Sequence, residues 1–166
     1  MDKVYIETSI VSYASAWPSR DIETAARQQQ ARDWWAIERP KFQLVASQLT
    51  LDEASVGNAD AAADRLKLLD GLPLVDINSD TEALAAKLLR AHTMPQKAAA
   101  DALHVAAAAL GGVKYLLTLN CKHIANAHEL PRIYDLLNRE GIGQMLICTP
   151  AEFLGGDSDD QEPTDT

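Results

Sequence analysis

Short apolar segments alternate with helical segments along most of this chain, and that alternation restricts the fold more than any other feature of the sequence. Apolar and β-forming residues dominate each short segment, as is typical of strands buried on both faces. Strands that are separated by helices form a parallel sheet with helices on its two sides. The sequence therefore predicts an α/β fold of three layers with about five parallel strands, at 4–6, 43–47, 72–77, 115–119 and 145–148.

Helix signals lie between these strands. Ser79 with Glu82, and Thr149 with Glu152, have the spacing of capping boxes, and Pro131 divides one long helical segment into two pieces. Prolines and glycines end most of the other helices. The expected helices cover 10–16, 19–39, 49–57, 58–69, 79–92, 96–110 and 124–140, with a last short helix near Thr149.

The composition fits one domain. The chain has 166 residues, of which 47% are hydrophobic, so it can bury a substantial core. No apolar run reaches the roughly 18 residues that a membrane helix needs, and Glu7 interrupts any signal-like pattern early. We therefore expect a cytoplasmic protein with no membrane partner and one domain at 1–154. Residues 155–166 hold five acidic residues and no basic one, which predicts a disordered acidic tail.

The charge argues against a general nucleic-acid-binding surface. The formal net charge of −9 becomes −4 without the tail, because 19 acidic and 15 basic residues remain. A polyanionic substrate would then need a local basic rim or a bound cation. Cys121 and Cys148 are expected to be free thiols in a reducing compartment. Cys121 and His123 supply only two zinc-type ligands, so we discount zinc.

Polar side chains follow the first strand at once. Glu7, Thr8 and Ser9 come directly after the apolar residues at 4–6. Ligands of parallel α/β sheets bind at the C-terminal ends of strands, so a carboxylate with two hydroxyls suggests a site here. The alternative is that Glu7 is a solvated turn residue, and that Thr8 or Ser9 caps the next helix.

A nearly apolar helix carries the second candidate. Only Asp101 and His104 are polar within 98–110, so this helix is expected to be buried. A buried carboxylate must be paired, hydrogen-bonded or bound to a metal, which favours an Asp101 that faces a cleft. The alternative is a local ion pair between Lys97 and Asp101, beside a histidine with a purely structural role.

Two more oxygen-bearing side chains are expected at the same edge of the sheet. Asn120 follows the strand at 115–119, where it can serve as an oxygen ligand or cap the next turn. Glu53 lies about one helical turn beyond the second strand, and Asp52 points to a different face. Carboxylate oxygens about 5 Å apart would repel by roughly 3 kcal/mol per pair. A divalent cation removes that repulsion, and oxygen donors suit Mg²⁺ or Mn²⁺.

Four short motifs in this order resemble the PIN-domain family, and specifically the VapC-type toxins of bacterial toxin–antitoxin pairs. The motifs are Tyr-Ile-Glu-Thr-Ser at 5–9, Leu-Asp-Glu-Ala-Ser at 51–55, Asp-Ala-Leu-His-Val-Ala at 101–106 and Leu-Leu-Thr-Leu-Asn-Cys-Lys-His-Ile-Ala-Asn at 116–126. The likeness extends from residue 3 to about residue 153. It implies a Rossmann-like parallel sheet, acidic residues that bind Mg²⁺ or Mn²⁺, and hydrolysis of RNA.

The resemblance also implies roles for individual residues. The catalytic and metal-binding set is Glu7, Glu53, Asp101 and Asn120. Supporting positions beside that set are Thr8, Ser9, Thr118 and His123. The candidates to meet RNA phosphates are Lys97, Lys122 and His123.

The implied function is a metal-dependent endoribonuclease, acting as the toxin of a toxin–antitoxin pair. Its expected partners are RNA, a small antitoxin protein and a second copy of the chain. Glu7 departs from the family pattern, because most members have an aspartate there, and many have another aspartate in place of Asn120. One alternative is therefore a catalytically weakened PIN-like binding or interaction module.

Two further alternatives fit less well. A phosphoacceptor domain needs an aspartate nucleophile at a strand end, whereas Asp101 is predicted within a helix. A nuclease with paired histidines, such as His104 and His123, gains no support from their spacing and would keep its activity in a chelator.

Overall fold

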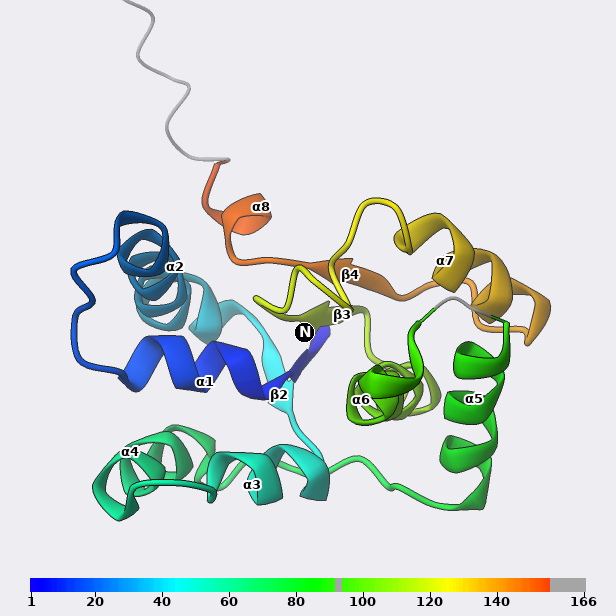
Figure 1. Cartoon of the computed structure of the whole chain (residues 1–166), viewed down its shortest axis with the longest axis horizontal. Coiled ribbons are helices and arrows are strands. Elements are labelled where there is room, and N and C mark those ends of the chain that lie inside the picture. The colour runs from blue at the N-terminus through cyan, green and yellow to red at the C-terminus, as the bar shows by residue number, and fades with distance from the viewer. Residues whose placement is uncertain (92–93, 156–166) are drawn as a thin grey trace, which may run out of the picture.

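The computed structural model describes residues 1–91 and 94–155. Its centre is a parallel sheet with the strand order β2-β1-β3-β4 (Figure 1). The strands are β1 Lys3–Ile6, β2 Gln43–Val45, β3 Tyr115–Leu117 and β4 Leu146–Cys148. β1 lies inside the sheet, where Val4 pairs with Leu44 on one side and with Tyr115 on the other. The segments that follow β1 and β3 therefore leave the sheet at the same edge.

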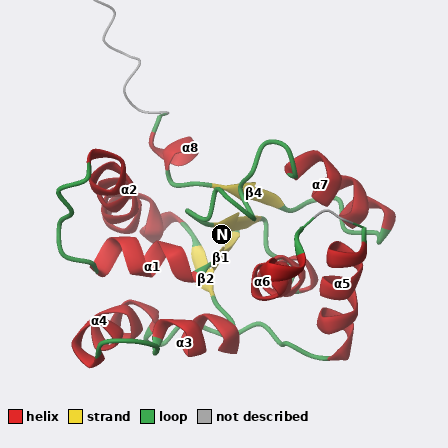
Figure 2. Ribbon diagram, in the orientation of Figure 1, coloured by secondary structure: helices red, strands yellow, loops and turns green. Residues whose placement is uncertain are grey.

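Helices cover both faces of this sheet (Figure 2). Alternate side chains of a strand point to opposite faces, and β1 follows that rule. Val4 and Ile6 join a core cluster with residues of α1 and α2, whereas Tyr5 joins the cluster formed with α5, α6 and α7. The predicted α/β class with a helix-covered parallel sheet is confirmed. The helices are α1 Thr8–Ser15, α2 Ile22–Asp33, α3 Gln48–Ala54, α4 Ala59–Leu69, α5 Ser79–Arg90, α6 Ala99–Leu110, α7 Leu130–Arg139 and α8 Ala151–Leu154.

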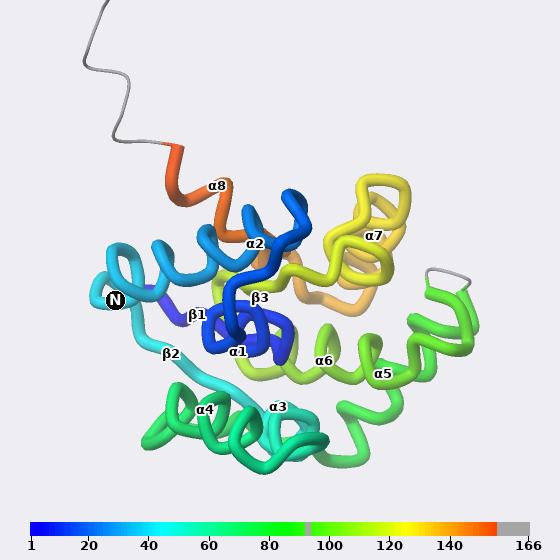
Figure 3. Tube along the Cα trace, turned by 60° about the vertical axis from the view of Figure 1, so that its left-hand side comes forward, coloured from blue at the N-terminus to red at the C-terminus, as the bar shows by residue number. Residues whose placement is uncertain are grey.

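Two helix packings position the candidate site. α1 lies between α2 and the neighbouring helices α3 and α4, with contacts to all three (Figure 3). On the other face α6 packs against α5 and β3. Its buried residues are mostly alanines, and their small side chains allow the helix to approach the sheet closely. A 3₁₀ turn at Gln96–Ala98 leads into α6, so the predicted helical segment at 96–110 is confirmed.

The predicted strand at 72–77 is wrong, and the sheet has four strands rather than five. This segment makes one isolated parallel bridge, between Leu74 and Ala46. The carbonyl of Pro73 accepts from Ala46, and Val75 donates back to Ala46. Pro73 has no N–H of its own to donate, so it cannot extend this pairing into a ladder.

Element boundaries account for the other differences. β2 ends at Val45 rather than at 47, and β3 ends at Leu117 rather than at 119. Asn78, not Ser79, caps α5, and its capping-box partner is Thr81 rather than Glu82. α7 begins at Leu130 with Pro131 in its first turn, so this proline starts a helix and does not divide one. Turns replace the predicted helix at 124–129.

The predicted helix at 19–39 is divided into three parts. Asp21 caps α2 in place of Ser19. The chain then continues as a π-helical turn at Trp34–Glu38 and a 3₁₀ turn at Arg39–Lys41 that contains Pro40. Near the C-terminus Glu152 accepts a hydrogen bond from the Thr149 backbone N–H, which is one half of the predicted capping box. The other half is absent from the part of the chain that the structure describes, because Pro150 is the N-cap of α8 and makes no side-chain cap bond.

Some predictions cannot be compared with this structure. The expected helix end at His92 and the acidic tail after Gly155 lie outside the described residues. Within 1–91 and 94–155, no helix is both long enough and apolar enough to cross a membrane.

Candidate active site

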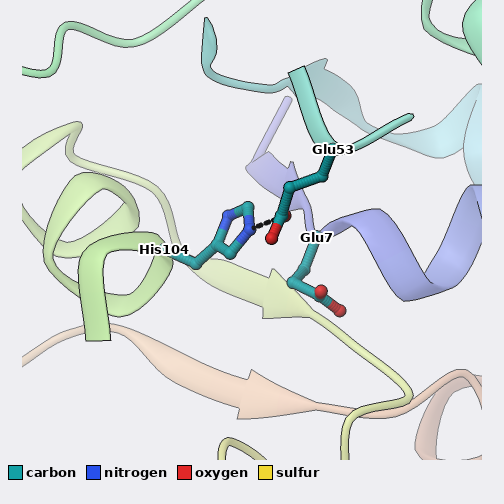
Figure 4. Close-up of side chains that lie close together, drawn as sticks. All are labelled: Glu7, Glu53 and His104. Atoms are coloured by element: carbon teal, nitrogen blue, oxygen red, sulfur yellow. Dashed lines mark hydrogen bonds and ion pairs between the residues drawn. The ribbon is translucent and has the colours of Figure 1, made fainter. Parts of the chain in front are cut away.

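Side chains from separate parts of the chain meet at the edge where β1 and β3 end. Glu7 follows β1, Glu53 lies in α3, Asp101 lies in the first turn of α6, and Asn120 comes three residues after β3. Figure 4 shows Glu7 and Glu53 beside His104, which also comes from α6. These side chains are distant in the sequence. They lie together because parallel strands end at the same edge of the sheet and the helices that carry the other side chains pass beside it.

Glu7 is a buried residue and the N-cap of α1. Its side chain is 5% exposed, and it accepts a hydrogen bond from the Ser9 backbone N–H at 3.2 Å. The hydroxyls of Ser9 and Thr118 also donate to it, the latter at 2.7 Å. Glu7 is therefore not a solvated turn residue, and neither Thr8 nor Ser9 is the cap. Within the described residues all three bonds reach Oε2, which leaves Oε1 for another ligand.

Thr118 links the first and third strands at this point. Besides donating to Glu7, its hydroxyl accepts a hydrogen bond of 2.9 Å from the Asn120 backbone N–H. The Ser9 hydroxyl accepts from the Leu119 backbone N–H at 2.8 Å. The two hydroxyl residues thus fix the orientation of the Glu7 carboxylate and the path of the chain after β3.

Glu53 is held by a histidine and a threonine. His104 Nε2 lies 2.5 Å from Glu53 Oε1, and the Thr8 hydroxyl donates to the same oxygen at 2.6 Å. His104 is 0% exposed, and its Nδ1 lies 2.7 Å from the Tyr5 hydroxyl. Tyr5 in turn lies 2.7 Å from the Ser47 hydroxyl.

The chemistry of these groups fixes which atoms donate. Partial burial raises the pKa of Glu53, but the hydrogen bond and charge of His104 and the hydrogen bond from Thr8 outweigh it and leave the pKa lowered. Glu53 is therefore an ionised acceptor, and His104 Nε2 must donate to it. Burial is the main cause that raises the pKa of Tyr5 to about 12, so Tyr5 remains a phenol. The Tyr5 hydroxyl therefore keeps its proton, 2.7 Å from His104 Nδ1.

Asp101 and Asn120 lie beside this network and interact with each other. Burial raises the pKa of Asp101, aided by the negative charge of Glu53 and opposed by a hydrogen bond from Asn120 and by nearby histidines. Asn120 Oδ1 also accepts from the His123 backbone N–H at 3.1 Å, so Asn120 does cap the following turn. Lys97 is exposed, and the ion pairs of the described residues do not include one between Lys97 and Asp101.

The donor set suits a hard divalent cation. Glu7, Glu53 and His104 each place a possible ligand atom within 4.8 Å of the others. Both nitrogens of His104 are already used in hydrogen bonds, so we assign it to orienting Glu53 and not to the cation. The two glutamates offer the oxygen ligands that Mg²⁺ and Mn²⁺ prefer. Asp101 is outside this 4.8 Å group but lies near enough for the charge of Glu53 to affect its pKa. Both of these metals are therefore compatible with the residues present.

Sequence reasoning missed Tyr5, Ser47 and the role of His104. Tyr5 had the pattern of an ordinary strand aromatic, and its hydroxyl meets a histidine 99 residues away. The one available signal was the polar His104 in an otherwise apolar helix. Its complete burial also excludes it from direct contact with RNA, which removes the alternative of a nuclease with paired His104 and His123.

Comparison with protein families agrees with this geometry. The model of the PIN domain matches residues 4–129, which is most of the chain. The chain belongs to the PIN domain family. The match includes Glu7, Glu53, Asp101 and Asn120, and the resemblance noted in the sequence motifs is thereby confirmed at the level of the family.

A solved structure shares the fold. VapC20 of Mycobacterium tuberculosis, described as a toxin that cleaves the sarcin–ricin loop, is 20% identical with a TM-score of 0.55. The alignment covers 72% of this chain and 91% of VapC20. At this identity the likeness extends to the fold. No curated protein matches the sequence.

Proposed function

We propose that this PIN-domain protein is a metal-dependent endoribonuclease that acts as the toxin of a toxin–antitoxin pair. The observation that carries the proposal is the approach of two carboxylates, Glu7 and Glu53, beside Asp101 at the strand-end edge of a PIN fold. The structural likeness to VapC20, described as a toxin that cleaves the sarcin–ricin loop, supports this proposal. A small antitoxin, a homodimer and a cytoplasmic location belong to this proposal.

Each residue has a distinct part in the proposed reaction. Glu7, Glu53 and Asp101 hold Mg²⁺ or Mn²⁺, and Asn120 orients Asp101 through its side-chain hydrogen bond. A bound cation would supply Lewis-acid chemistry that lowers the pKa of a water. The carboxylates orient the attacking water toward the phosphorus. Thr8, Ser9 and Thr118 keep the two glutamates in place through the bonds described above.

Cleavage of RNA under controlled metal conditions tests this function. Removal of divalent cations with a chelator should stop cleavage by the purified protein, and Mg²⁺ or Mn²⁺ should restore it. Asp101→Asn should lower the cleavage rate by about 100-fold or more, because it removes a metal-binding charge. Asp64→Asn makes the same chemical change at an exposed position of α4 and should cleave normally. Unchanged cleavage by Asp101→Asn would refute the assignment of this site.

A second candidate is a PIN-like binding module with weakened catalysis. It is favoured by the hydrogen bonds that already occupy Glu7 Oε2 and by the hydrogen bond between Asn120 and Asp101. Such a module would bind RNA or a protein partner without turnover. Absence of cleavage across a range of Mn²⁺ concentrations, with RNA binding retained, would favour this candidate.

A further inference from the structure

A groove opens beside Glu7, one of the proposed metal-binding carboxylates. Its volume is about 540 Å³, and Glu7 and Asn120 form part of its lining. Tyr13 from α1, Arg27 from α2, and Lys122 from the segment after β3 line it as well. The volume is within the range of about 300–1,000 Å³ in which proteins bind small ligands. The groove therefore has room for one nucleotide, and it adjoins the proposed metal site.

The groove places opposite charges next to each other. Its acidic residue, Glu7, belongs to the metal site, whereas Arg27 and Lys122 are the basic residues of its lining. Two cations around one groove are notable in a chain whose net charge is −9. With a cation neutralising the carboxylates, the whole groove becomes favourable for a strand with a negative charge at each phosphate.

Arg27 is held in position by its neighbour. Tyr13 and Arg27 both line the groove, and the proximity of Tyr13 raises the pKa of the guanidinium above its ordinary value. Tyr13 itself packs partly against the core cluster shared by α1 and α2. A guanidinium fixed on a packed side chain loses less freedom when it binds a phosphate than a free surface arginine does.

We propose that this groove binds the nucleotide next to the scissile phosphodiester of an RNA strand, with Arg27 and Lys122 on its phosphate and Tyr13 holding Arg27. The inference rests on the proposed ribonuclease function and assigns the residues that receive the substrate beside the reacting phosphate. Of the three basic or histidine residues that the sequence offered for this task, only Lys122 lines the groove; Arg27 and Tyr13 had no sequence signal.

Binding measurements test the groove without any cleavage. The probe is a fluorescein-labelled single-stranded RNA 12-mer of mixed sequence. It is added to protein that carries Asp101→Asn in every sample, which prevents cleavage and removes one negative charge from the proposed metal site. Arg27→Ala in this background should weaken binding by about tenfold, because a charge-assisted hydrogen bond is lost. The slope of log K against log salt should fall by about 0.7, as expected for one phosphate contact with a single strand.

Further variants separate a contact from a structural effect. Lys122→Ala, at an exposed position, should weaken binding in the same direction, and Arg27→Lys should recover part of the affinity. Arg139→Ala removes an equal charge from α7, where Arg139 pairs with Asp135, and should bind like the parent. Without the Asp101 change, Arg27→Ala should raise KM and leave kcat within about twofold.

A native thiol gives an independent measurement. Cys121 is exposed and lines the groove, whereas Cys148 is half-buried and lies outside it. Bound RNA 12-mer should slow alkylation of Cys121 by iodoacetamide and leave Cys148 unaffected. RNA that binds without protecting Cys121, or affinity that is indifferent to both Arg27→Ala and Lys122→Ala, would overturn the groove proposal. Failure of the wild-type protein to cleave RNA would instead count against the proposed function alone.

Discussion

His104 can influence the proposed reaction although it is sealed from solvent. It connects Tyr5 to Glu53 with hydrogen bonds on both ring nitrogens. Groups that orient a metal ligand commonly change metal affinity or activity by about 10–100-fold when removed. The Tyr5–His104–Glu53 network is therefore expected to set the direction of the Glu53 carboxylate.

Removing His104 should reduce cleavage. His104→Ala is expected to lower kcat by roughly 10–100-fold, and Tyr5→Phe, which keeps the aromatic ring, should have a smaller effect. RNA cleavage at saturating Mn²⁺, with Mn²⁺ binding measured alongside, checks this expectation. His128→Ala changes an exposed histidine and serves as the control. Normal kcat and normal Mn²⁺ affinity in His104→Ala would show that Glu53 needs no such support.

Glu7→Asp tests the residue that departs from the family pattern. The shorter side chain cannot reach Ser9 and Thr118 as Glu7 does, so we expect a stability loss of about 1 kcal/mol and no gain in activity. Chemical denaturation and RNA cleavage measure the two effects. An increase in cleavage would mean that the longer glutamate weakens the wild-type site, as the binding-module alternative requires.

The strand-end rule brought Glu7 and Asn120 to one edge from the sequence alone. The rule does not predict their hydrogen-bond partners, because bonds such as that between Thr118 and Glu7 join residues 111 positions apart. Lys97 was a candidate for RNA phosphates from its position near Asp101, but it is exposed and does not line the groove, whereas Arg27 does. Only the packing of α1 against α2 distinguishes a groove residue from an ordinary surface cation.

At the scale of elements, the N-terminal boundary of α5 can be tested by mutating its cap. The Asn78 side chain accepts from the backbone N–H groups of Asp80 and Thr81, while the Thr81 hydroxyl accepts from the Asn78 N–H. Asn78→Ala should therefore destabilise the protein by about 1 kcal/mol. Ser79→Ala, the predicted cap, should change stability by less than about 0.5 kcal/mol. Denaturant unfolding of both variants compares them, and equal losses would contradict the observed cap.

The differences between predicted and observed element boundaries share one cause: local sequence signals do not specify which tertiary partner a residue will have. Asn78 and Ser79 both favour helix caps, so propensity alone could not choose between them. Pro131 signalled the end of one helical piece as readily as the start of another. The isolated bridge at Leu74 likewise depends on what Ala46 can pair with, which no local pattern specifies.

At the scale of the whole molecule, a bound cation should stabilise the fold. Mn²⁺ at about 100 times its dissociation constant contributes about 2.7 kcal/mol, which corresponds to a rise in Tm of roughly 5–10 °C for a chain of this size. Thermal unfolding with Mn²⁺, and then with excess chelator, measures the effect. The Asp101→Asn protein should show little of this rise. A rise of equal size in that variant would place the cation elsewhere.

The two cysteines should differ in reactivity. Burial, with a smaller effect from the charge of Glu152, raises the pKa of Cys148 to about 11, so its reactive thiolate is scarce at neutral pH and increases as the pH rises. Iodoacetamide near pH 8 should therefore modify the exposed Cys121 first. Peptide mass mapping over time checks the order. Faster labelling of Cys148 would contradict the burial on which this expectation depends.

The position of β1 between β2 and β3 has a consequence for synthesis. β1 is made first, yet its partner β3 begins at Tyr115, and the hydroxyl that completes the environment of Glu7 belongs to Thr118. Contacts between such distant residues form late, because a long loop must close first. The environment of Glu7 is therefore incomplete until the chain has been made through Thr118, so the proposed site cannot form on a growing chain that ends before this residue.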